Sequence, residues 1–145
     1  MRLLLDAMCG GLRSYLRLCG HDTAYVLDRF ESEAPDDAIA ALASEEDRRL
    51  VTRDVALAGR AEDALLVESR DLEDQLRELR AAGVALAPAE PAYCGRCNGR
   101  LRPLEGDPAE YVPDDAEPVW VCEACGQQFW KGSHWDRMRE TLAEL

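Results

Sequence analysis

RLLLDAMCGGL, residues 2–12, contains a short apolar run after its first residue and two glycines before its last. Three consecutive leucines at 3–5 are typical of a strand that is buried on both faces, as the strands of parallel sheets are. Asp6 follows this run directly, and Gly10 and Gly11 precede apolar residues at helical spacing. The segment therefore predicts a buried strand, a loop that carries a carboxylate, and a helix.

The same alternation continues to about residue 86. Alternating strands and helices predict an α/β fold with an open, mainly parallel sheet and helices on both of its faces. The further strands are predicted at 23–27, 50–52, 65–67 and 84–86, and the helices at 10–19, 36–47, 55–61 and 72–82.

Composition narrows the class of protein. The chain has 145 residues and a formal net charge of −12, which argues against a simple basic groove for nucleic acid. It does not exclude a nuclease, because metal-binding carboxylates add negative charge themselves. No apolar stretch approaches the roughly 20 residues of a membrane span. Asp6 also interrupts the only candidate leader segment, so we expect a cytoplasmic protein without a membrane partner.

A boundary is predicted at LAPAEPAYC, residues 86–94, where two prolines interrupt the alternation. We therefore expect an α/β domain at 1–88 and a second unit at 89–145. The second unit ends in a predicted helix, for which Ser133 and Asp136 form a start that resembles a capping box.

Two C-x-x-C pairs lie in the second unit, separated by 24 residues. Four thiolates at such spacing are typical of tetrahedral zinc in a zinc ribbon, and the full ligand set leaves the ion a structural role. The alternative is a redox-active pair, although redox C-x-x-C motifs normally open a helix. Three arginines surround the first pair, and they either contact RNA phosphate or offset the thiolate charge: Arg96, Arg100 and Arg102. The predicted zinc ligands are Cys94, Cys97, Cys122 and Cys125.

Aspartates follow the predicted strands or open the predicted helix between them. Parallel strands bring their carboxyl ends to one edge of the sheet, where ligands bind in open α/β folds. Convergent carboxylates repel one another, and Mg²⁺ or Mn²⁺, which prefer oxygen ligands, relieves that repulsion. The residues concerned are Asp6, Asp28, Asp36, Asp37, Asp54 and Asp71.

Each aspartate also has a plainer interpretation as a helix cap or a solvated loop residue. We keep that interpretation for Asp28 and Asp71 and favour a functional one for Asp6, whose capping role is the least obvious.

Glycines and arginines near these aspartates are candidate substrate-binding residues. Gly10 and Gly11 would let the first loop and helix approach a phosphate closely. Arg13 and Arg17 lie one helical turn apart as a candidate phosphate-facing pair. Arg53 neighbours Asp54, where it would hold a phosphate or orient the carboxylate.

In combination these motifs resemble a PIN-like ribonuclease domain and, more closely, the C-terminal RNase domain of the Mut-seven exonuclease family. The resemblance extends over nearly the whole chain. It rests on LLLDAMCGGLRSYLRLCGHDTAY, PDDAIAALASEEDRRLVTRDVALA, the two cysteine pairs, and FWKGSHWDRM, which includes His134.

The resemblance implies a PIN-like sheet, a zinc ribbon and an acidic site for Mg²⁺ or Mn²⁺. By position Asp6 matches the first acidic residue and Asp54 a later one, while Asp36 opens the middle helix with Asp37 as its close rival. A fourth acidic residue, expected soon after Asp54, is absent, because residues 55–57 are Val, Ala and Leu.

Two functions follow. The first is a metal-dependent ribonuclease that hydrolyses RNA phosphodiester bonds at the aspartates. The second is a non-catalytic module that binds RNA or a protein partner on a PIN-like scaffold with structural zinc. The absent fourth acid and the net charge of −12 favour the second.

Overall fold

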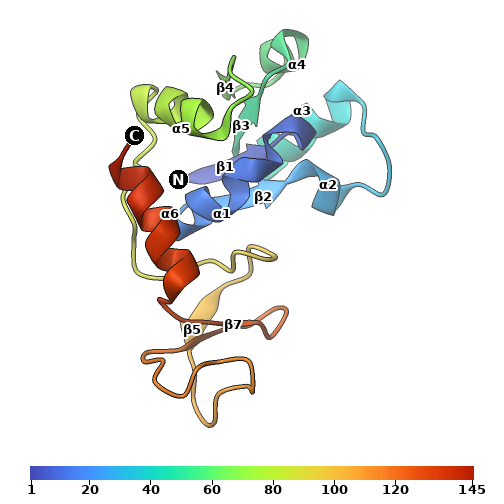
Figure 1. Cartoon of the computed structure of the whole chain (residues 1–145). Coiled ribbons are helices and arrows are strands. Elements are labelled where there is room, and N and C mark those ends of the chain that lie inside the picture. The colour runs from blue at the N-terminus through green and yellow to red at the C-terminus, as the bar shows by residue number, and fades with distance from the viewer.

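The computed structural model describes all 145 residues and contains two sheets (Figure 1). The larger sheet is formed by β1 (Arg2–Leu5), β2 (Asp22–Tyr25), β3 (Arg49–Thr52) and β4 (Ala64–Leu66). Its connections contain the 3₁₀ helix η1 (Ala7–Leu12) and the helices α1 (Arg13–Leu18), α2 (Val26–Arg29), α3 (Asp36–Glu45) and α4 (Val55–Arg60), and α5 (Leu72–Ala81) follows β4.

All neighbouring strands of the larger sheet are parallel, in the order β2-β1-β3-β4. Leu5 is in register with Tyr25 on one side and with Val51 on the other. After β2 the chain crosses β1 to form β3, so the direction of strand addition reverses between β1 and β3. In open α/β sheets such a reversal opens a crevice at the carboxyl ends of the strands, and ligands bind there.

The sheet is buried on both faces, as the run of leucines predicts. On one face Leu3 and Leu5 belong to a core cluster that η1, α1, α5 and the last helix complete. On the other face Leu4 and Leu50 pack with residues of α3 and α4. The predicted α/β class with helices on both faces of a parallel sheet is therefore confirmed.

A small antiparallel sheet follows, in the order β5-β6-β7. We call residues 90–131, which include this sheet and all four C-x-x-C cysteines, the cysteine module. The last helix, α6, then returns to the larger sheet, where Leu142 enters the core (Figure 1). The bounds are β5 (Leu101–Pro103), β6 (Trp120–Cys122), β7 (Gln128–Phe129) and α6 (Ser133–Ala143).

Polar contacts join the cysteine module to the larger sheet. The Nη1 of Arg17 in α1 donates to the carbonyl of Gly95 at 2.8 Å. The Nδ2 of Asn98 donates to the Oδ1 of Asp22 at 2.7 Å. The division into domains at 1–88 and 89–145 stays a prediction, and these bonds cross it.

Two predicted strands are wrong in part. The strand at 23–27 ends at Tyr25, because the chain turns into α2 and the amide of Phe30 donates to the carbonyl of Val26. The segment 84–86 forms no strand. Val84 is buried there, but its amide closes the end of α5 by donating to Leu79.

Two helix starts also differ from the prediction. The helix at 10–19 divides into η1 and α1, consistent with the low helix propensity of the paired glycines. Ser133 does not cap α6. Gly132 is the N-cap, and a Cβ there would lie 2.6 Å from the Nε1 of Trp130, so the close approach of that indole requires glycine.

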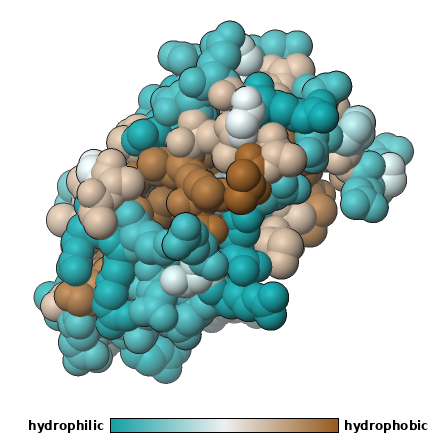
Figure 2. All heavy atoms as spheres, turned by 90° about the horizontal axis from the view of Figure 1, so that it is seen from above, coloured by the Kyte–Doolittle hydropathy of each residue, from teal (hydrophilic) through white to brown (hydrophobic).

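None of the helices combines the length and the apolar character that a membrane crossing requires. Figure 2 views the molecule from above Figure 1 and shows apolar residues gathered at the centre of a largely hydrophilic face. Met8 in η1, Val55 in α4 and Leu66 in β4 are large apolar side chains with substantial exposure.

Candidate active site and metal centre

Asp6 and Asp54 meet at the carboxyl ends of β1 and β3, where the strand order reverses. A single side chain joins them: the Oγ1 of Thr52 donates to the Oδ2 of Asp6 at 2.7 Å and accepts from the amide of Asp54 at 3.0 Å. Thr52 is fully buried at the end of β3, so its hydroxyl is held in place by the sheet. Thr52, which the prediction omitted, thus binds the carboxylate of Asp6 and the backbone of Asp54 at this edge.

The two carboxylates also hold the turns that follow their strands. The Oδ1 of Asp6 accepts from the amide of Ala7 at 2.8 Å. The Oδ1 of Asp54 accepts from the amides of Ala56 and Leu57, which makes Asp54 the N-cap of α4. The Oδ2 of Asp54 takes part in no protein hydrogen bond. The capping interpretation and the functional one are therefore compatible at Asp54, since each uses a different oxygen.

Asp36 and Asp37 lie in the first turn of α3, which packs against α4. Asp37 forms an ion pair with Arg60 at the end of α4. The hydrogen bond and charge of Asp37 raise the pKa of Arg60, and the charges of Asp36 and Asp54 act in the same direction. Arg60 is thus the shared neighbour of these three carboxylates. The aspartates do not, however, form a compact group of three or more metal-binding atoms like the cysteine cluster below.

Arg13 and Gly10 are organised around Tyr25. The guanidinium of Arg13 stacks over the Tyr25 ring at 4.4 Å, and its Nε donates to the carbonyl of Gly10. The Tyr25 hydroxyl donates to the carbonyl of Ala7 at 2.8 Å. A Cβ at Gly10 would lie 2.6 Å from that hydroxyl, whereas a Cβ at Gly11 would make only an ordinary contact. Of the two predicted glycines, only Gly10 is required by a close approach.

Arg53 lies between the acidic edge and the loop before α5. Its Nη2 makes a long hydrogen bond of 3.4 Å to the carbonyl of Glu68. Its Nε is buried and has no hydrogen-bond partner. An unpaired buried donor is unfavourable, and a donor on a cation is suited to an anionic group. Because the Nε is shielded from solvent, the predicted role of Arg53 in holding a phosphate falls to the terminal nitrogens of its half-buried guanidinium.

The two cysteines outside the C-x-x-C pairs are not nucleophiles. Burial raises the pKa of the Cys9 thiol to about 11, with a further contribution from the charge of Asp6. Burial likewise raises the pKa of Cys19 to about 11. Both thiols stay protonated near neutral pH, and both belong to the apolar core cluster, as small buried hydrophobic residues do.

The four remaining cysteines form a compact cluster in the cysteine module. Their sulfur atoms all lie within 4.8 Å of one another, and no other group of three or more potential ligands in the chain is this close. The Sγ atoms of Cys97 and Cys122 are 3.5 Å apart, and those of Cys94 and Cys125 are 3.7 Å apart. Tetrahedral zinc with bonds of about 2.3 Å to sulfur separates its ligands by about 3.8 Å, so the cluster fits such an ion.

Backbone amides around the cluster are directed at its sulfur atoms. The amides of Arg96, Gly99 and Cys125 each lie 3.4 Å from a cysteine Sγ. Burial opposes ionisation of Cys122, but the amides of Cys125 and Ala124 together with the thiols of Cys97 and Cys125 outweigh it and lower the pKa of Cys122 to about 7. For Cys94 burial prevails and raises the pKa to about 12, and burial also raises the pKa of Cys97. Oriented N–H groups of this kind stabilise thiolates, the form in which cysteine binds metals.

Arg17 is not the phosphate-facing residue that its spacing from Arg13 predicts. It is buried, and its guanidinium donates to the carbonyls of Thr23 and Gly95. Helical spacing places the two arginines on one side of α1, but the cysteine module covers the second of them. Arg17 therefore links α1 to the first cysteine pair.

Sequence reasoning missed Thr52 and Tyr25. A signal for Thr52 exists in LVTRD, residues 50–54, because the only polar residue inside a buried strand needs a partner. The role of Tyr25 has no such signal, since it depends on the parallel register with Leu5. His134 lies exposed in the first turn of α6 and lines a cleft described below.

Comparison with known proteins gives one match. The family model described as the Mut7-C RNAse domain matches residues 1–142, which is nearly the whole chain. No curated protein matches the chain significantly, and no solved structure does so either.

Proposed function

Because this chain belongs to the Mut7-C RNAse domain family, we propose that it is a metal-dependent ribonuclease whose acidic residues are Asp6, Asp36 and Asp54, with Asp37 as the alternative to Asp36. The observation that carries this proposal is the Thr52 hydroxyl, which binds the Asp6 carboxylate and the backbone amide of Asp54 where the strand order reverses. RNA is the substrate class that the family description indicates.

The acidic residues offer only oxygen ligands, which suit Mg²⁺ or Mn²⁺. When bound, such an ion activates a water molecule and stabilises the charge that develops on the phosphate. Thr52 fixes the direction of the Asp6 carboxylate, and the N-cap bonds fix Asp54. Through the terminal nitrogens of its guanidinium, Arg53 binds a phosphate oxygen of the RNA. Arg13 and Tyr25 support the loop that carries Gly10.

For the cysteine module we propose structural zinc. Four sulfur ligands complete the coordination of the ion, so no position is open for a substrate. The N–H groups directed at the sulfur atoms support this assignment. The two metal sites then differ in role, because zinc holds the fold and the exchangeable ion serves the chemistry.

The test is cleavage of a labelled RNA by zinc-loaded protein in the presence of Mn²⁺. Asp6→Asn and Asp54→Asn each remove a ligand, and we expect losses of more than 100-fold. Thr52→Val removes only the positioning hydroxyl, and changes of that kind typically lower activity by about 10- to 100-fold. Asp71→Asn is the matched control, because Asp71 caps α5 as Asp54 caps α4 but lies outside the proposed ligand set.

A second outcome corresponds to the non-catalytic alternative, which the ion pair of Asp37 with Arg60 and the absent fourth acid favour. Calorimetric titration with Mn²⁺ distinguishes the two functions. Saturable binding to the wild type that Asp6→Asn abolishes supports the nuclease. RNA binding with neither Mn²⁺ binding nor cleavage would establish the binding module instead.

A further inference from the structure

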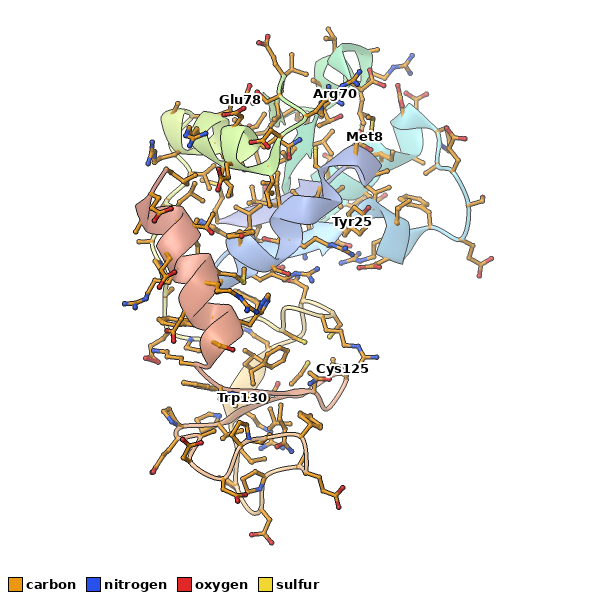
Figure 3. The ribbon with its side chains drawn as sticks, in the orientation of Figure 1. Met8, Tyr25, Arg70, Glu78, Cys125 and Trp130 are labelled. Atoms are coloured by element: carbon orange, nitrogen blue, oxygen red, sulfur yellow. The ribbon has the colours of Figure 1, made fainter.

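A cleft of about 490 Å³ lies between α1, the cysteine module and the start of α6, separate from the acidic edge. Its volume falls in the usual range for small-molecule sites. Ser14 and Leu18 of α1 form one wall, and Gly95 and Phe129 contribute from the cysteine module. In Figure 3 Trp130 lies in this part of the molecule, away from Met8 and Tyr25 at the acidic edge.

Aromatic side chains dominate the lining. All three tryptophans of the chain line the cleft, together with Tyr93 and Phe129. Only Trp120 is buried, and the other four rings are only partly covered. We call Tyr93, Trp120, Phe129, Trp130 and Trp135 the aromatic cleft.

The charge of the lining is opposite to the charge of the chain. Among 145 residues 29 are acidic, yet none of the 20 lining residues is Asp or Glu. Arg17, Arg96 and Lys131, the only lysine, line the cleft. The carbonyl bonds of Arg17 occupy its guanidinium, so Arg96 and Lys131 are the cations available to a ligand.

These two cations are held only weakly by the protein. Arg96 is exposed and its guanidinium donates to the side-chain oxygen of Gln127. Lys131 lies 3.7 Å from Glu90, an exposed pair of a kind that contributes little. Its Nζ lies 5.1 Å from the ring centroid of Trp135 and 5.9 Å from that of Trp120. A cation thus lies beside aromatic rings. In such an arrangement the cation suits a phosphate and the rings suit a nucleobase.

We propose that the aromatic cleft binds unpaired nucleobases of single-stranded RNA, with Arg96 and Lys131 on the adjacent phosphates. The proposal rests on RNA being the substrate of the acidic site. Stacking on aromatic rings requires bases that are free of a duplex, and a basic groove beside such rings is the common design of single-strand sites. The net charge of −12 makes this local basic lining the favoured place for a polyanion.

The first helix connects the cleft to the acidic edge. Arg13 at the start of α1 stacks on Tyr25 next to η1, which follows Asp6 directly. Ser14 and Leu18 of the same helix line the cleft. An RNA strand held in the cleft therefore has a route along α1 to the acidic edge, and the cleft selects single strands for cleavage.

The test is the binding of a fluorescein-labelled 12-nucleotide oligouridine to zinc-loaded full-length protein without Mg²⁺ or Mn²⁺, followed by anisotropy. Loss of one aromatic ring on which a base stacks is expected to weaken binding by about 5- to 100-fold, and we expect this loss for Trp135→Ala. Trp135→Phe keeps an aromatic ring, so its loss of affinity should be smaller. Arg96→Glu and Lys131→Glu weaken binding and reduce its salt dependence. Arg137→Glu is the matched control, since Arg137 is exposed in α6 and lies outside the cleft lining.

Intrinsic fluorescence gives a direct readout, because all three tryptophans line the cleft and bound RNA is expected to quench them. Circular dichroism and zinc content show whether each variant is folded. If Trp135→Ala does not fold, Lys131→Glu tests the proposal in its place. Unchanged binding in the Arg96 and Lys131 variants would overturn the proposal. Equal affinity of the wild type for an RNA duplex of the same length would also overturn it. Cleavage that does not depend on the cleft residues would support the ribonuclease and overturn the cleft proposal. Binding at the cleft by a protein that cleaves no RNA would support the cleft proposal and overturn the ribonuclease.

Discussion

The larger sheet and the cysteine module are stabilised by different means. Core clusters of 14 and 7 buried residues fill the two faces of the sheet. No residue between 90 and 131 belongs to either cluster. The module instead gathers four sulfur atoms within 4.8 Å and has three short strands around them. Apolar burial stabilises the first region, and the proposed zinc ion stabilises the second.

This difference separates the two kinds of chemistry. At the acidic edge the proposed ligands project from a sheet with a large apolar core, so we expect the ion there to exchange. In the cysteine module the proposed ligands come from two turns that have little core of their own, so we expect metal binding to supply their folding free energy. The predictions below test this contrast and start with the largest effect.

Removal of the zinc ligand Cys94 by Cys94→Ser is expected to unfold the cysteine module and spare the larger sheet. Metal binding by zinc-finger peptides contributes roughly 10–16 kcal/mol, far more than a segment with so small a core can replace. Hydrogen exchange read by mass spectrometry should show lost protection at 94–131 and retained protection in β1 and β3. Cys19→Ser, a buried thiol outside the cluster, is the control for zinc content. A fully protected module in Cys94→Ser would contradict the contrast.

Asp22 is the residue at which the two regions depend on each other. It accepts hydrogen bonds from the buried Arg48 at 2.8 Å, from Arg2 at 2.7 Å and from Asn98 of the first cysteine pair at 2.7 Å. These bonds outweigh burial and lower its pKa. Asp22→Ala removes one of the two carboxylates that the buried Arg48 binds, leaves Glu46 as the other, and deprives Asn98 of its acceptor, so it should cost about 2 kcal/mol in urea unfolding.

The control for Asp22→Ala is Asp63→Ala, which removes a largely exposed partner of Arg49 and should cost less than about 1 kcal/mol. Similar losses in the two variants would mean that the contacts between the regions contribute no more than a surface ion pair.

The sequence predicts the two regions with different success, for a physical reason. The cysteine cluster follows from spacing alone, because two ligands in each C-x-x-C pair are fixed by one local turn. The sheet follows from the alternation of apolar runs, and its class is confirmed. Predictions failed where tertiary contacts decided the outcome. Val84 looks like part of a strand but is drawn into the core at the end of α5.

The candidate active site was predictable only in part. The edge at which Asp6 and Asp54 meet follows from strand direction. That Thr52 joins them, that Arg60 pairs with Asp37 and that Arg17 is covered depend on which elements pack together. The aromatic cleft arises where three separate segments meet, and no single stretch of sequence indicates it.

Gly10 and Gly11 sharpen the contrast inside the sheet region, because only Gly10 is constrained by packing. A Cβ at Gly10 would overlap the Tyr25 hydroxyl, which is fixed by its bond to Ala7. Overpacking of this kind costs about 1–3 kcal/mol, so Gly10→Ala should lower the thermal stability and, by moving the loop after Asp6, RNA cleavage. Gly11→Ala should change stability by less than about 0.5 kcal/mol. Equal effects would show that Tyr25 does not hold this loop.

Acid should weaken the larger sheet through Glu46, with the smallest of these effects. Hydrogen bonding to Arg29, aided by Arg48, lowers the pKa of Glu46 from 4.5 to about 2. The unfolded chain therefore binds more protons between these values, so this contribution is present above pH 4.5 and is lost as pH falls through 2. Because water reaches the pair, its contribution is less than about 1 kcal/mol. Glu46→Gln should reduce the pH dependence of the urea midpoint across this window. Glu45→Gln, at an exposed neighbour without an ion pair, should leave that dependence unchanged. A slope unchanged in Glu46→Gln would assign the acid sensitivity to other carboxylates.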